Sequence, residues 1–248
     1  MDHQQKNRLL PVSVLIAALL VSGSVVFSAI YKMPSGASGT AYTAANAAAN
    51  PGAATINTPA GNATTQLGPR DAILGKANAP VTYIDYGDYQ CPFCNRYFTD
   101  TFPSLKSEYV DTGKIKMVFR DLAFLGPESL AAANAAQCAN DQGKLWPYHD
   151  ELYTGKSKDY ASGGSENDGY FTRSLFLTFA NQIGLDMPKF TSCLDGNNNM
   201  AYVAQEKTAA SDQGINSTPT FSIDGTEVQG SQPLANFEAV INQALASK

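Results

Sequence analysis

Histidine and cysteine are scarce in this chain, which limits the kinds of site that it can hold. Its 248 residues include two histidines, His3 and His149, and four cysteines, of which only two are closely spaced. Structural zinc and iron-sulfur sites need clusters of such ligands, so we expect no metal and no other cofactor. Four cysteines are also too few for a disulfide-dense miniprotein, so the fold must depend on a hydrophobic core.

Positive charge is also in short supply. The chain has 17 Lys and Arg against 22 Asp and Glu, a net charge of -5, and no basic run beyond the N-terminus. Binding along a polyphosphate backbone needs a basic patch or stripe. We therefore expect no nucleic-acid partner.

Charged residues are missing altogether from segment 9–31. As a helix, this segment would be about 35 Å long, against a hydrocarbon core of about 30 Å. Lys6 and Arg8 precede it and only Lys32 follows, which by the positive-inside rule places the N-terminus in the cytoplasm. We expect residues 1–32 to be a cytoplasmic tip and a transmembrane anchor, with the rest extracytoplasmic, in a periplasm or at a cell surface. A cleaved signal peptide, which would release a secreted domain, is the alternative.

Residues 33–66 contain no charge and almost no large apolar side chain. Such a segment cannot bury enough surface to offset its ordering entropy, so we expect a disordered linker rich in Ala, Gly, Ser and Thr. Residues 67–248 are long enough to form one folded domain with a single core.

The pattern of the folded part predicts an α/β domain. Residues 81–86 predict a buried strand, and a helix is expected from Pro92 to about Val110, with a kink at Pro103. Residues 114–120 alternate in polarity and predict a second strand, placed as a right-handed crossover would place it.

A long helical stretch then interrupts the strands. We expect an all-helical insertion over about 127–214, within which the polar, Gly-rich segment 155–169 is expected to be an exposed loop. Residues 220–229 predict two short strands joined by an Asp-Gly turn, and residues 233–246 predict an amphipathic closing helix.

A Cys-Pro-Phe-Cys sequence stands where the first helix is expected to begin. There, the Cys91 sulfur would face unpaired backbone N–H groups and the positive end of the helix dipole, which favour the thiolate. The spacing lets Cys94 reach a mixed disulfide on Cys91 and resolve it. We expect Cys91 to be the exposed, reacting sulfur and Cys94 the more buried one. An inert disulfide or half of a zinc site is the alternative.

Three features together resemble one known family. They are segment 85–94 (DYGDYQCPFC), segment 217–221 (STPTF) before the predicted hairpin, and the interposed helices. In these features the chain resembles the DsbA-like branch of the thioredoxin superfamily, over about 67–248. The resemblance implies a thioredoxin fold with an inserted all-helical subdomain, and a protein disulfide oxidoreductase that exchanges disulfides with exported proteins.

The resemblance also implies roles around the two cysteines. Asp85 falls on the family's buried strand acid, which relays the proton of Cys94; a solvated carboxylate is the alternative. Phe93 stands where the strongest oxidants of the branch carry His, which leaves the redox potential open.

A second region carries roles for substrate binding. Pro219 falls on the family's cis-proline, although an ordinary trans proline stays open. The backbone of Thr218 would then face Cys91 and pair with an extended substrate. Pro92 and Phe93 would contact the substrate as well.

The remaining cysteines and aromatic candidates have simpler explanations. We expect Cys138 and Cys193 to form a structural disulfide, because both lie in the helical insertion and the compartment is oxidising. Trp146 and His149 share a predicted helix without an evident catalytic partner, so we expect structural roles for both.

These observations predict a membrane-tethered, extracytoplasmic thiol:disulfide oxidoreductase, acting as an oxidase. Its expected partners are exported proteins with free thiols or disulfides, a redox partner that recycles the site, and the membrane. A reductase or isomerase of the same fold is one alternative. A tethered binding or chaperone module with an inert disulfide is the other.

Overall fold

The structure is a computed structural model, and it describes residues 56–57 and 65–248. The predicted anchor at 1–32 and most of the predicted linker at 33–66 lie outside these residues. Within the described part, no helix is both long enough and apolar enough to cross a membrane. The anchor and its orientation therefore stay predictions.

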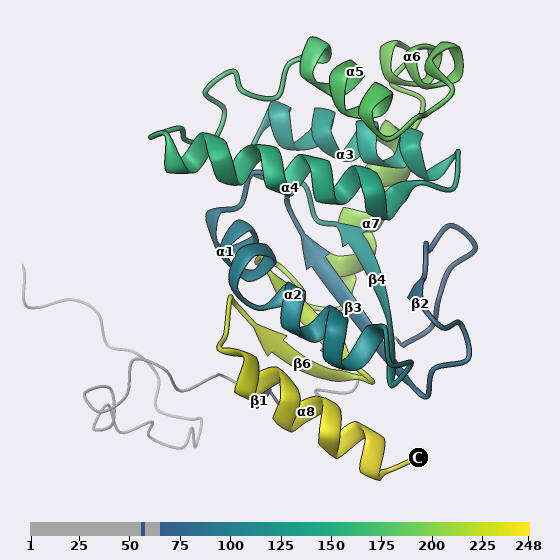
Figure 1. Cartoon of the computed structure of the whole chain (residues 1–248), viewed down its shortest axis with the longest axis vertical. Helices are drawn as coiled ribbons and strands as arrows, with labels where there is room; N and C mark the ends of the chain where they lie inside the picture. Colours follow the sequence, from purple (N-terminus) through teal and green to yellow (C-terminus); the bar gives the residue numbers. More distant parts are fainter. Residues whose placement is uncertain (1–55, 58–64) are drawn as a thin grey trace, which may run out of the picture. The chain divides into compact units, whose positions relative to one another are not determined.

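A six-stranded mixed sheet forms the centre of the described domain (Figure 1). Its strands lie in the order β1-β6-β5-β3-β4-β2. Their bounds are β1 (Ile56–Asn57), β2 (Leu74–Gly75), β3 (Val81–Gly87), β4 (Ile115–Asp121), β5 (Thr220–Ile223) and β6 (Thr226–Gln229). The central strand β3 pairs in parallel with β4 and antiparallel with β5. The strands predicted from the sequence are confirmed to within a few residues.

Two short strands were not predicted. β1 falls inside the segment expected to be a linker, and that expectation is wrong for Ile56 and Asn57, which pair antiparallel with Val228 and Glu227 of β6. β2 pairs in the same way with β4 at the opposite edge. A strand of two residues is too short to show an alternation of apolar and polar side chains. Each of these strands is therefore recognised only by its pairing with a neighbouring strand.

The helix after β3 is broken into three pieces. They are α1 (Pro92–Asp100), α2 (Phe102–Leu105) and a π-helical turn, η1 (Lys106–Val110). The break falls at Thr101, next to the predicted kink at Pro103, which occupies the first turn of α2. A proline is tolerated there because the first N–H groups of a helix have no intrahelical partner.

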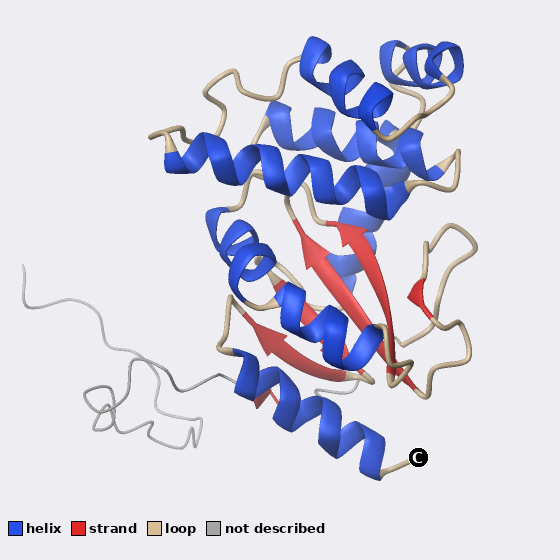
Figure 2. Cartoon of the chain, in the orientation of Figure 1, coloured by secondary structure: helices blue, strands red, loops and turns tan. Residues whose placement is uncertain are grey.

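Both faces of the sheet are covered by helices (Figure 2). On one face, Tyr83 and Phe221 of the sheet pack with Tyr97 of α1 and Phe237 of α8 (Leu234–Ala246). On the other face, Ile84 and Tyr86 belong to a separate buried cluster that includes residues at the end of α7. Alternate residues of β3 thus face opposite layers, as the period of two requires.

The predicted helical insertion lies between β4 and β5. It consists of α3 (Pro127–Asn140), α4 (Leu145–Ala161), α5 (Arg173–Gln182), α6 (Met187–Asp195) and α7 (Met200–Asp212). A disulfide between Cys138 and Cys193 joins α3 to α6, with 5.8 Å between the Cα atoms. The pairing agrees with the expectation from the sequence.

The exposed loop predicted at 155–169 is wrong over its first half, because α4 continues to Ala161. The Lys156 side chain is fully buried, and its Nζ donates to Asp159 at 2.7 Å, to Asp168 at 3.4 Å and to the Ser165 carbonyl at 2.6 Å. Gly155 is needed because a Cβ there would lie 2.7 Å from the Phe179 ring. The polar end of α4 is therefore helical, and it is built around the buried ammonium group of Lys156.

Replacing Lys156 should test this buried ion cluster. Lys156→Ala leaves the Asp159 carboxylate without its buried partner, so we expect the free energy of unfolding to fall by about 3 kcal/mol. Urea unfolding measures the change. Lys158→Ala is the matched control, because Lys158 is exposed on the same helix and should change stability by less than about 0.5 kcal/mol. Equal effects of the two changes would contradict the assignment.

The disulfide should stabilise the insertion without taking part in thiol exchange. Closing a loop of about 56 residues contributes about 4 kcal/mol in the chain-entropy model, so Cys138→Ser with Cys193→Ser should lower the melting temperature markedly. Exchange at the other two cysteines should persist below the new melting temperature. Loss of exchange in a folded double variant would instead place this pair in the redox cycle.

Candidate active site

Cys91 and Cys94 stand at the turn from β3 into α1. Cys91 is the N-cap of the helix, and its Sγ accepts the backbone N–H of Cys94 at 3.5 Å. Pro92 follows in the first turn, where no N–H is needed. Both cysteines are free thiols. The structure therefore confirms the predicted position of the pair at a helix N-terminus.

The two thiols differ in acidity. The hydrogen bond from the Cys94 thiol is the largest influence on Cys91. Together with the contact to Thr218 and the backbone N–H groups of Cys94 and Phe93, it lowers the pKa of Cys91 to about 7, against the opposing effect of burial. Burial raises the pKa of the Cys94 thiol well above its usual value. The first sulfur can therefore be a thiolate near neutral pH while the second stays a thiol.

The expectation that Cys91 is exposed is wrong. Cys91 is 3% exposed and Cys94 is 2% exposed. The Cys91 thiol donates to the Thr218 carbonyl oxygen at 3.4 Å, so the loop before β5 covers one side of the sulfur. Phe93, in contrast, is 53% exposed, and its ring lies 5.5 Å from the Arg96 guanidinium. The side chain between the cysteines, more than the sulfur itself, forms the accessible surface.

The loop before β5 has the arrangement expected from the sequence. The peptide bond between Thr218 and Pro219 is cis, and the contact of the Thr218 carbonyl oxygen with Cys91 brings together two segments 127 residues apart. A backbone carbonyl next to the reactive sulfur offers a hydrogen-bonding group to an extended chain, whatever its side chains.

Asp85 is a buried acid rather than a solvated carboxylate. It is 6% exposed, and burial, with the nearby Cys91 thiolate as a smaller cause, raises its pKa well above the usual value. Asp85 and Cys94 line the same narrow cavity, which is too small to hold a water molecule. The alternative of a solvated strand end is therefore wrong.

Asp88 and Gln90, which were not predicted as site residues, fix the turn before Cys91. The Asp88 carboxylate accepts hydrogen bonds from the Gln90 backbone at 2.9 Å, from the Ser129 hydroxyl at 2.6 Å, and from two backbone N–H groups of the loop after β4. Gln90 is completely buried and its side-chain amide donates to Ser129 at 2.8 Å. The only signal in the sequence was their place inside the family segment 85–94.

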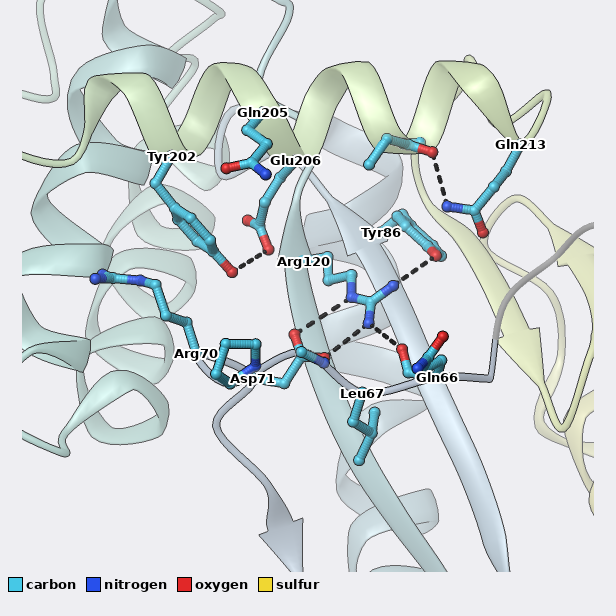
Figure 3. Close-up of a pocket in the computed structure, with 14 residues that line it drawn as sticks. Gln66, Leu67, Arg70, Asp71, Tyr86, Arg120, Tyr202, Gln205, Glu206 and Gln213 are labelled. Carbon is cyan, nitrogen blue, oxygen red and sulfur yellow. Dashed lines mark hydrogen bonds and ion pairs between the residues drawn. The ribbon is translucent and has the colours of Figure 1, made fainter.

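A larger cavity, of about 570 Å³, lies on the other face of the sheet and contains neither cysteine (Figure 3). Its charged groups already have partners within the protein. Arg120 pairs with Asp71 at 2.7 Å and also donates to the Tyr86 hydroxyl, while Glu206 accepts from Tyr202 at 2.9 Å. The thiol chemistry is not at this cavity, so we assign the active site to the cysteine pair.

The sheet, the cysteine pair at the start of α1, the cis-proline beside it and the helical insertion define a thiol-disulfide exchange domain. A family model described as thioredoxin matches residues 68–243. The chain therefore belongs to the thioredoxin family. This match agrees with the resemblance to the DsbA-like branch of the thioredoxin superfamily that the sequence motifs indicate.

Curated relatives include proteins named for disulfide bond formation and antiporters of greater length. The chain is 29% identical over 156 residues to the probable disulfide bond formation protein D of Bacillus anthracis, covering 61% of this chain and 69% of the relative. It is 28% identical over 179 residues to the Na(+)/H(+) antiporter NhaA 1 of Salinispora arenicola, covering 71% of this chain. The match spans only 25% of the antiporter's length.

Solved structures show the same fold. The alpha-DsbA1 of Wolbachia pipientis superposes with a TM-score of 0.63 at 23% identity, over 73% of this chain and 94% of that protein. Oxidised BdbD of Bacillus subtilis superposes with a TM-score of 0.62, also at 23% identity, over 71% of this chain and 94% of that protein. At this identity the likeness establishes the fold alone.

The acidity of Cys91 can be measured by alkylation. In the reduced protein, the rate of reaction with iodoacetamide should rise with pH as the thiolate forms, with a midpoint at about pH 7. Mass spectrometry should find the label on Cys91 and none on Cys94. Cys94→Ala should move the midpoint upward, because the hydrogen bond that most lowers the Cys91 pKa is lost. A wild-type midpoint near the free-cysteine value of about 8.5 would contradict the assignment.

Proposed function

We propose that this protein is a thiol:disulfide oxidoreductase that introduces disulfides into exported proteins. The observation that carries the proposal is the pair of adjacent thiols with opposite acidities, in which Cys91 has a pKa of about 7 and Cys94 a pKa well above its usual range. A disulfide is a stronger oxidant when its reduced form is stabilised, and here a Cys91 thiolate is stabilised by the helix N-terminus.

The reaction starts from the disulfide form of the pair. A substrate thiolate attacks the Cys91 sulfur, the bond between the two cysteines breaks, and Cys94 leaves as a thiolate that takes a proton from the Asp85 carboxyl. A second substrate thiolate then attacks the substrate sulfur of the mixed disulfide, and Cys91 leaves as a thiolate. The substrate is thereby oxidised by two electrons and the cysteine pair is reduced.

The surroundings of Cys91 support a role in holding an extended substrate. The Thr218 carbonyl, 3.4 Å from the sulfur, would accept a backbone hydrogen bond and bring the substrate sulfur into line. Pro92 and the exposed Phe93 would contact the chain on the other side. This mode of binding needs no particular substrate side chain, which suits an enzyme that acts on many exported proteins.

The proposal includes the place of the reaction and its recycling. The uncharged segment 9–31 would anchor the chain, with the domain outside the cytoplasm, and a separate redox partner would reoxidise the cysteine pair. The names of several curated relatives support thiol exchange as the activity. A reductase or isomerase would use the same residues at a lower potential, with a partner that supplies electrons.

The equilibrium reduction potential of the Cys91 and Cys94 pair tests the direction. We expect a value between about -270 mV, that of thioredoxin, and about -120 mV, that of the strong oxidant DsbA. Phe93→His should raise the potential and lower the Cys91 pKa together, because a hydrogen-bond donor and positive charge stabilise the same thiolate.

The control is Ile73→His, which places the same side chain at an exposed position beside β2 and should leave both quantities unchanged. A wild-type potential at or below that of thioredoxin would overturn the oxidase assignment in favour of the reductase. A pair that does not exchange with glutathione at all would support the inert-disulfide alternative.

A further inference from the structure

Two carboxyl groups meet where α7 packs against the end of β4. Asp121 is the last residue of β4, and Glu206 lies in the middle of α7. The backbone N–H of Asp121 donates to Glu206 Oε2 at 3.0 Å, and a further hydrogen bond joins the two side chains. Neither residue lines the cavity beside Cys94, so this acid pair is separate from the thiol site.

The surroundings of Asp121 leave one of its carboxyl oxygens to Glu206. Asp121 is 1% exposed, and its Oδ2 accepts a hydrogen bond from the Gln137 side chain at 2.8 Å. Within residues 56–57 and 65–248, no N–H group and no hydroxyl donates to the buried Oδ1. A buried acceptor without a donor destabilises the folded state. A proton held between the two carboxyl groups would supply the missing donor.

The Glu206 carboxyl is fixed from two sides. Its Oε2 accepts the Asp121 backbone N–H, and its Oε1 accepts the Tyr202 hydroxyl at 2.9 Å (Figure 3). The Arg120 guanidinium lines the same cavity but pairs with Asp71 at 2.7 Å. Two carboxylates in contact repel each other, whereas one proton between them turns the repulsion into a hydrogen bond. The geometry therefore favours a pair that carries one proton.

The acidity of the two groups agrees with this geometry. Burial raises the pKa of Asp121 well above its usual value, and the charge of Glu206 is the next cause. Burial also raises the pKa of Glu206 to about 7, against the opposing effect of the hydrogen bonds from Asp121 and Tyr202. Both carboxyls thus hold a proton more readily in the folded protein than in water.

We propose that Asp121 and Glu206 share one proton and form a pH-sensitive latch between α7 and the end of β4. The latch is closed while one carboxyl is protonated, and it weakens when both are ionised. The backbone N–H groups of Phe124 and Leu125, shortly after Asp121, donate to Asp88. The latch therefore lies beside the loop that supports the turn before Cys91. This inference goes beyond the proposed function and holds for either direction of thiol exchange.

The sign of the pH effect follows from the raised pKa of Glu206. When α7 detaches locally, Glu206 is solvated and its pKa returns to its ordinary value of about 4.3. The attached form then binds more protons than the detached form. The stabilisation is therefore fully present at low pH and is lost as the pH rises through about 7.

The charged and titratable groups that face the pair come from several elements. They are Asp88 and Tyr89 in the turn after β3, Arg120 on β4, Asp71 in the segment before β2, and Tyr202 on α7. The Asp71 carboxylate is paired with Arg120, and that of Asp88 accepts four hydrogen bonds. Burial raises the pKa of both tyrosines above the usual value of about 10. Their hydroxyls keep their protons over the range in which the latch should open.

Hydrogen exchange on the full-length protein measures the latch where it acts. Mass spectrometry follows the amides of α7 at about pH 5.5 and about pH 8.5, on either side of the Glu206 pKa, and each rate is corrected for the pH dependence of an unstructured peptide. In the wild type, we expect the corrected exchange to be about tenfold or more faster at the higher pH. Corrected exchange that does not rise with pH would contradict the latch.

Asp121→Asn should imitate the closed latch at every pH. The new amide can donate to Glu206 while its oxygen still accepts from Gln137, so corrected exchange should differ by less than about twofold between the two pH values. Asp212→Asn is the matched control, because it makes the same substitution at an exposed position of the same helix and should keep the wild-type rise. A folded Asp121→Asn variant that also keeps this rise would overturn the proposal.

Two further measurements decide the matter if Asp121→Asn does not fold. Glu206→Gln removes the carboxyl that titrates and should also abolish the rise in exchange. Carbon NMR of the wild type needs no variant, and the Glu206 carboxyl carbon should titrate with a midpoint at about pH 7. Midpoints at the ordinary values of about 3.9 for Asp121 and about 4.3 for Glu206 would overturn the proposal. None of these measurements involves thiol exchange, so their outcome is independent of the proposed function.

Discussion

The carboxylate of Asp88 is the group on which the geometry of the active site depends. It is 1% exposed, and its two oxygens accept four hydrogen bonds. A carboxylate can be buried at this depth only when donors replace its lost hydration. The donors come from the turn before Cys91, from the loop after β4 and from Ser129 of α3. A single side chain therefore fixes the start of α1 to both the sheet and the helical insertion.

The difference between the two sulfurs follows from their places on that helix. Cys91 stands at the N-cap, where unpaired N–H groups point at its sulfur. Cys94 lies one turn further on, in an apolar enclosure shared with Asp85, where a thiolate would be poorly stabilised. Both residues are almost completely buried, but burial is the leading influence on the pKa only at Cys94. The hydrogen bond from the Cys94 thiol, supported by the Thr218 contact and by backbone donors at the helix end, makes the first thiol the acidic one.

The sequence was sufficient where local signals determine the structure. Short-range signals include the β-branched run of β3, the proline after Cys91 and the Asp-Gly turn between β5 and β6. The two segments that resemble the DsbA-like family also predicted that Thr218 lies close to Cys91. The sequence was insufficient where distant groups decide the outcome. The polar end of α4 was predicted to be a loop because the partners that bury Lys156, such as Asp168, are identified only by the fold. The burial of Cys91 depends on a loop 127 residues away.

The helical insertion does more than extend the fold, because α4 forms one wall of the active site. The Ser157 hydroxyl donates to the Asn95 side chain of α1 at 2.9 Å, and the Tyr160 hydroxyl donates to the Gln90 carbonyl. On the same helix, His149 reaches the cavity behind Cys94. The sheet and α1 thus supply the two thiols and Asp85, while the insertion supplies their enclosure. Burial is the leading reason for the raised pKa of Cys94, and His149 and Tyr153 of α4 line the cavity beside that sulfur, so α4 contributes to the difference between the two thiols.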